Sequence, residues 1–270
     1  MLEDELLGIL DASPHLERLS LEGIRVGDSE AVGHILAHMD TPAITSLKVF
    51  TQTSGEDAAR ALSLFFPDDR LPKRLFSDPP IFKIKTRDPN TARIEFTIGS
   101  FEIQFKSNEY SRVYQDAVVA CIPLVPSSVT TLQVDFRELD QQVWRGFFRS
   151  HPGVRSIECH KRSNAGPECK SLWDALSLAQ EGDAVILRQN LESIRFNLRS
   201  WKADLTPLLT CLRDRNSVGF ELRHLNIDGG WGEAHKMVED FRPLVEVLEV
   251  KLPSMEQQRV SRTSTYETNA

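Results

Sequence analysis

Few residues of this chain have types and spacings that suit catalysis or metal binding. His34 and His38 stand four apart in HILAH, a spacing that places two metal ligands on one helix face. The segment lacks the glutamate that a zinc hydrolase of this pattern needs, so surface histidines of a helix are the favoured interpretation. Cys159 and His160, followed by Cys169, form a second candidate metal site. Cys159 also fits the last apolar position of VRSIEC, where it would be a core residue, and we expect no metal.

The glycine-rich string IDGGWGEAH, which contains Asp228, is the third candidate. A phosphate-binding loop needs GK[ST] or G-x-G-x-x-G, and neither spacing is present, so a tight turn after a strand is favoured. No serine stands in a G-x-S-x-G elbow, and no pair stands out among the 39 acidic residues. We therefore expect a chain that is not an enzyme and has no cofactor. An unrecognised enzyme that uses the Cys159–His160 region or the Asp228 loop is the less favoured alternative.

The composition excludes several classes of partner. The chain has 270 residues, 40% of them hydrophobic and 26% charged, and a formal net charge of −7. Such a charge attracts neither nucleic acid nor an anionic membrane, so we expect neither as a partner. Four scattered cysteines and the lack of a signal segment favour a reducing compartment, cytoplasmic or nuclear.

A six-residue phrase, apolar-x-x-apolar-x-apolar, recurs along the chain and organises it. The copies are LERLSL from Leu16, ITSLKV from Ile44, VTTLQV from Val129, VRSIEC from Val154, LESIRF from Leu191, LRHLNI from Leu222 and VEVLEV from Val245. Helical apolar spacing precedes the copies, as with Val143, Phe147 and Phe148 before Val154. The pattern is typical of leucine-rich repeats and predicts an α/β fold, a single irregular solenoid of helix-turn-strand units over 1–253. The polar tail, 254–270, is predicted to be disordered.

A different pattern interrupts the long gap between Ile44 and Val129. In ARIEFTIGSFEIQFK apolar and polar residues alternate on both sides of Gly99-Ser100, a two-residue turn signal. This alternation predicts an antiparallel hairpin with its apolar side chains on one face. With IFKIKT from Ile81 as a further strand, the insertion spans about 81–106.

The repeat strands also indicate where a partner would bind. Side chains alternate across a strand, so the residues around the last two apolar positions of each phrase project from the open side of the strand layer. We expect the carboxyl-terminal copies to carry a protein-binding surface. Its predicted residues are Glu158, His160, Arg195, Asn197, His224, Asn226 and Asp228.

The segments SPHLERLSLEG, SHPGVRSIEC, NLESIRF and ELRHLNIDG resemble the divergent leucine-rich-repeat region of fungal F-box proteins. The resemblance implies the substrate receptor of a ubiquitin ligase, in which an F-box docks on the ligase adaptor and the repeats hold the protein to be ubiquitinated. The helical F-box motif is not recognisable ahead of Leu6. The resemblance therefore implies the adaptor as a partner only if an F-box exists outside this chain. The alternative is a truncated or degenerate repeat protein with no specific partner.

Overall fold

The structure, a computed structural model, describes residues 8, 12–13, 15–24, 46–52, 81–86, 93–98, 101–106, 115, 118–119, 121–135, 139–161, 170–177, 190–198, 205–229 and 237–251. The chain divides into two compact units. Unit 1 comprises Met1–Val134 with Gln142–Val154, and unit 2 comprises Asp135–Gln141 with Arg155–Ala270. Both mix strands and helices, so the α/β class expected from the sequence is confirmed.

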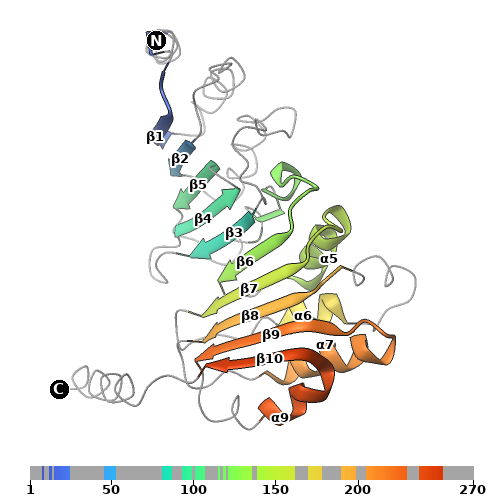
Figure 1. The fold of residues 1–270 in the computed structure, drawn as a ribbon. Coiled ribbons are helices and arrows are strands. Elements are labelled where there is room, and N and C mark those ends of the chain that lie inside the picture. The colour runs from blue at the N-terminus through green and yellow to red at the C-terminus, as the bar shows by residue number, and fades with distance from the viewer. Residues whose placement is uncertain are drawn as a thin grey trace, which may run out of the picture. The chain divides into compact units, whose positions relative to one another are not determined.

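Each of the recurring phrases overlaps a β-strand (Figure 1). The strands are β1 (Arg18–Ile24), β2 (Ser46–Gln52), β6 (Thr131–Asp135), β7 (Ser156–Lys161), β8 (Ser193–Leu198), β9 (Leu222–Gly229) and β10 (Val245–Lys251). The phrase forms a strand because its last two apolar positions are separated by one residue and so lie on the same face.

In unit 1 the strands follow the order β1-β2-β5-β4-β3-β6. Three strands lie between β2 and β6: β3 (Ile81–Thr86), β4 (Arg93–Ile98) and β5 (Phe101–Lys106). β4 is antiparallel to both β3 and β5, whereas β2 with β5 and β3 with β6 are parallel. Ile98 lies opposite Phe101, and Phe96 lies opposite Ile103. The side chains of β4 and β5 fall outside the described residues, and with them the expected apolar face.

The core of unit 1 includes α5 (Gln141–Ser150), which lies where apolar spacing predicted a helix. Phe147 and Phe148 are buried, and their rings pack edge to face with centroids 5.5 Å apart. His151, only 3% exposed, follows the helix. Its Nδ1 lies 2.9 Å from the carbonyl oxygen of Phe147, and its Nε2 lies 3.0 Å from that of Val125. The ring thus ties the end of α5 to the turn after the short helix η3 (Ile122–Leu124).

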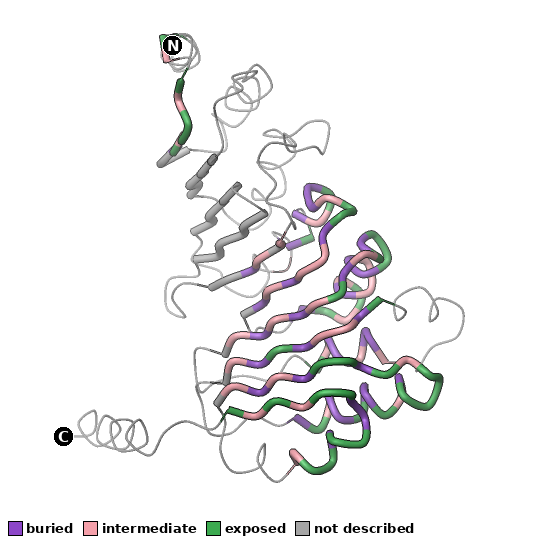
Figure 2. The backbone as a smooth tube through the Cα atoms, in the orientation of Figure 1, coloured by how far each residue is buried: buried purple, intermediate pink, exposed green. Residues whose placement is uncertain are grey.

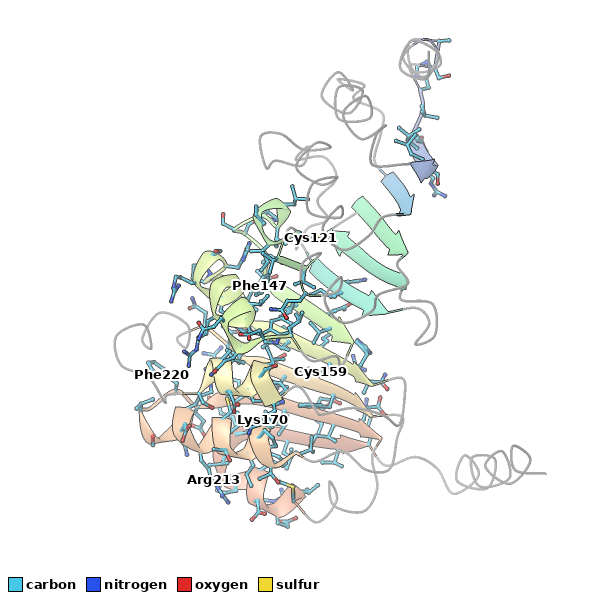
Figure 3. All side chains as sticks on the ribbon, turned by 180° about the vertical axis from the view of Figure 1, so that it is seen from behind. Cys121, Phe147, Cys159, Lys170, Arg213 and Phe220 are labelled. Carbon is cyan, nitrogen blue, oxygen red and sulfur yellow. The ribbon has the colours of Figure 1, made fainter. Side chains whose placement is uncertain are left out.

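In unit 2 the strands β7, β8, β9 and β10 are parallel and follow one another in chain order. Helices α6 (Lys170–Leu176), α7 (Thr206–Ser217) and α9 (Val238–Phe241), with the 3-10 turn η4 (Arg242–Leu244), connect them. These helices lie behind the strands in Figure 1 and in front of them in the reverse view of Figure 3. They therefore cover one face of the four strands, and no described helix covers the other.

The core of unit 2 lies between these two layers. Ile194, Phe196, Leu225 and Ile227 on the strands are at most 1% exposed. The ring centroids of Phe196 and of Trp173 on α6 are 5.5 Å apart. From α7, buried Arg215 donates a hydrogen bond from Nη2 to the carbonyl oxygen of Leu191, at 3.3 Å. Apolar contact and this polar link together hold the helices on the strand layer.

A glycine in the left-handed region ends α7. Gly219 has φ +81°. The amide of Phe220 donates to the carbonyl of Arg215 at 3.0 Å, and the amide of Gly219 donates to that of Asn216 at 3.0 Å. This pair of bonds is a Schellman motif, and it turns the chain from α7 into β9.

Candidate functional site

The predicted binding residues lie on the side of the unit 2 strands that the helices leave open. On β8, Arg195 and Asn197 alternate with Ile194 and Phe196, which are 1% and 0% exposed. The same alternation holds on β7 and β9. Figure 2 shows it as a change of colour from residue to residue along these strands. The predicted residues therefore project away from the core, as expected from the alternation.

Parallel pairing brings these residues together in three rows across the four strands. We call the set the open strand face. The first row is Ser156, Ser193, His224 and Val247; the second is Glu158, Arg195, Asn226 and Glu249; the third is His160, Asn197, Asp228 and Lys251. All seven residues predicted from the sequence belong to this one surface. Segments far apart in the chain thus meet in a single patch.

Side-chain contacts connect neighbouring strands on the open strand face. The hydroxyl oxygens of Ser156 and Ser193 are 3.0 Å apart, within hydrogen-bond distance. Asn226 donates from Nδ2 to Oε2 of Glu249 at 2.7 Å. Along β7, His160 Nε2 lies 3.7 Å from Glu158 Oε2. Because these groups are partly exposed, the contacts orient the side chains more than they stabilise the fold.

Arg195 lies in the middle of the second row, between Glu158 and Asn226 on the adjacent strands. Its side chain is exposed, and its guanidinium makes no hydrogen bond or ion pair with the rest of the described chain. The acidic Glu249, by contrast, accepts the bond from Asn226. The centre of the patch therefore presents a cation whose five donors are available to a partner.

Cys159 and His160 do not form a joint chemical site. Cys159 is fully buried on the helix side of β7, whereas His160 on the open strand face is 36% exposed. Adjacent strand residues point to opposite sides, so the thiol and the imidazole cannot hold one metal ion or act as a nucleophile and its base. Cys121 and Cys211 are also buried. Within the described ranges no group of three or more possible metal ligands occurs.

Some candidates from the sequence lie outside the described residues. They are His34, His38, Cys169, Gly230, Gly232 and the tail 254–270. Asp228 is described, and it belongs to β9 in the third row of the open strand face.

One charged feature was missed in the sequence. The second residue of each phrase alternates in sign from strand to strand in unit 2, in a set that we call the charge column: Arg155, Glu192, Arg223 and Glu246. Arg155 Nη1 and Glu192 Oε1 are 3.6 Å apart, with side chains 60% and 40% exposed. A comparison of the second position of these four phrases would have revealed the column, because that position is charged in each of them.

Among the described residues no helix is both long and apolar enough to cross a membrane. No protein-family model, curated protein or solved structure matches the chain. Function is therefore inferred from the open strand face itself.

Proposed function

We propose that this protein is a protein-binding module and that the open strand face of β7–β10 is its recognition surface. The observation that carries the proposal is the register, which gathers all seven predicted residues into adjoining rows on a side that no described helix covers. Extended surfaces built from stacked repeats commonly serve recognition. Ser156, Ser193, Asn197 and Asn226 offer hydrogen bonds, and the charges are mixed in sign, which suits a protein surface better than a polyanion.

Repeated backbone contacts support a leucine-rich-repeat-like solenoid. The carbonyl of Arg155 accepts bonds from the amides of Glu192 and Ser193, at 2.8 and 3.0 Å. At the equivalent place one strand later, the carbonyl of Glu192 accepts bonds from the amides of Arg223 and His224, at 3.1 and 3.0 Å. The same phrase position thus makes the same pair of bonds in successive units. In this interpretation β3–β5 is an insertion into the array.

The resemblance to the repeat region of fungal F-box proteins suggests the kind of binding module. Such a region holds the substrate of a ubiquitin ligase, and the open strand face would hold it here. Adaptor recruitment would require an F-box, so we restrict the proposal for this chain to substrate binding.

Arg195 is expected to be the main contact. An exposed arginine between hydrogen-bonding neighbours suits a carboxylate of the partner, which it can bind with two parallel bonds. A singly charged carboxylate is favoured over a doubly charged phosphate, because Glu158 lies opposite Arg195 and Glu249 lies two strands away in the same row. The preferred partner segment therefore carries an aspartate or glutamate flanked by polar residues.

Affinity purification with matched variants tests the proposal. Wild type, Arg195→Glu and the control Arg213→Glu, an exposed charge on the helix side labelled in Figure 3, are used as baits in cell extract. We expect a specific protein whose recovery falls about tenfold or more with Arg195→Glu and is unchanged with Arg213→Glu. Titration of that purified protein then measures the two affinities directly. Equal recovery by wild type and Arg195→Glu would contradict the proposal, as would equal loss with both variants.

A further inference from the structure

The outer edge of β10 is a separate surface from the open strand face. β10 pairs with β9 along one side, and no described strand pairs with its other side. In a parallel sheet, alternate residues direct their amide and carbonyl groups to each side of the strand. β10 therefore presents a row of backbone donors and acceptors that can pair with another chain.

The apolar side chains of β10 are less buried than those of β9. Leu248 and Val250 lie opposite Leu225 and Ile227, which are 0% and 1% exposed. Leu248 and Val250 are themselves only half-buried, and Val247 on the opposite face is 40% exposed. Figure 2 shows the change, since the exposed colour is more extensive along β10 than along β8. A further strand beside β10 could place two apolar side chains against Leu248 and Val250 and so extend the core.

The charge column gives this edge a preferred partner. Its order is basic, acidic, basic, acidic from β7 to β10, and it ends at exposed Glu246. A basic residue in the next position would continue the alternation that brings Arg155 and Glu192 to within 3.6 Å. On the open strand face, Glu249 also favours a hydrogen-bond donor or a cation, and Lys251 favours an acid.

β9 already satisfies these requirements on the inner side of β10. Asn226 donates to Glu249 at 2.7 Å, and Asp228 lies opposite Lys251. Its Leu225 and Ile227 lie opposite the half-buried apolar pair of β10. The segment that complements the free edge therefore has the pattern of β9, LRHLNID.

We infer that the edge of β10 binds an extended segment of a partner protein by parallel strand addition. The segment places a basic residue beside Glu246, apolar residues beside Leu248 and Val250, a donor beside Glu249 and an acid beside Lys251. A second β10 in the same parallel register is disfavoured, because it would put Glu246 beside Glu246 and Glu249 beside Glu249. The charges on β10 thus disfavour parallel pairing with a second β10 and favour a segment of the complementary pattern.

A labelled peptide of sequence ELRHLNIDG, copied from 221–229, is the probe. Fluorescence anisotropy measures its binding to the full chain. We expect saturable binding that weakens about tenfold or more in the double variant Glu246→Lys with Lys251→Glu. A peptide with its arginine changed to glutamate and its aspartate to lysine should show the reverse preference. That reversal also excludes misfolding of the double variant, since a misfolded edge would bind neither peptide.

Two controls separate this edge from other surfaces. Lys170→Glu, on the helix side in Figure 3, should leave peptide binding unchanged, and so should Arg195→Glu on the open strand face. The inference is overturned if no saturable binding is seen, if charge reversal has no effect, or if Arg195→Glu abolishes binding while reversal on β10 does not. Light scattering that detects a dimer of the wild type, lost in the double variant, would overturn it in favour of a second copy.

Discussion

Asn226 and Glu249 are joined across β9 and β10 by a hydrogen bond of 2.7 Å from the amide Nδ2 to the carboxylate Oε2. The bond joins two members of the second row of the open strand face, one on β9 and one on the edge strand β10. It also holds the carboxylate of Glu249 towards β9.

A double-mutant cycle on this pair should give a small but measurable coupling. We expect Asn226→Ala and Glu249→Ala to show a coupling free energy of about 0.5–1 kcal/mol, because the bond is charge-assisted but partly exposed to water. Urea unfolding of the wild type, the two single variants and the double variant measures it. Additive effects of the two changes would show that the bond contributes nothing to stability.

Gly219 should be intolerant of alanine. With φ at +81°, a β-carbon strains the backbone even though nothing lies within 4 Å of it, so Gly219→Ala should cost about 1–2 kcal/mol. Gly146 within α5 is the matched control, because a β-carbon there would also meet open space but the backbone is helical. Gly146→Ala should stabilise by about 0.5–1 kcal/mol. Thermal unfolding compares the two, and destabilisation by both changes would contradict the backbone explanation.

His151 should be replaceable only at a cost to unit 1. Its two ring nitrogens lie within 3.0 Å of two carbonyl oxygens, and His151→Phe keeps a ring but removes both nitrogens. Leaving a buried carbonyl without a donor costs about 1–3 kcal/mol, so we expect a loss in this range. Denaturant unfolding measures it against His15→Phe, an exposed position where the change should be within about 0.5 kcal/mol. A loss as small as that at His15 would show that neither ring nitrogen supports the fold.

The buried thiol of Cys121 should make the free energy of unfolding decrease as the pH rises into the alkaline range. Burial raises the pKa of its thiol well above the usual value, so the folded chain keeps the thiol protonated. The unfolded chain loses that proton from about pH 8.5 upward. The stabilisation is therefore fully present below about pH 8.5 and is lost at about 1.4 kcal/mol per pH unit as the pH rises towards the folded pKa.

Comparison with Cys121→Ala isolates this effect. Between about pH 7.5 and 9.5, the difference in unfolding free energy between wild type and variant should change by about 1.4 kcal/mol in favour of the variant. Urea unfolding with a reducing agent present measures it at each pH. Parallel pH profiles for the two proteins would contradict the assignment.

Local patterns predicted much of the fold. The phrases located strands because one-residue alternation decides which side chains share a face, and that rule also located Arg195 and Asn226 on the open side. Helices α5 and α7 followed from their apolar spacing. The order β2-β5-β4-β3-β6 was not predicted, because the choice of partner strand depends on contacts between distant segments. The position of α6 was not predicted, because seven residues are too short for a clear period.

The site was predicted at the level of residues but not of contacts. Sequence alternation placed Asn226 on the surface, yet its bond to Glu249 depends on the register between β9 and β10. The charge column was overlooked because its residues precede the strand positions that were compared. Neither the rows nor the column can be deduced from one strand alone.

The paired amide bonds to the carbonyls of Arg155 and Glu192 have a consequence for how unit 2 opens. These bonds join β7 to β8 and β8 to β9. Opening of the strand layer should therefore begin at β10 and progress through β9 towards β8. Hydrogen exchange should therefore be fastest in β10 and slowest in β8. A peptide bound along β10 would then slow exchange two strands away, without touching β8 at all.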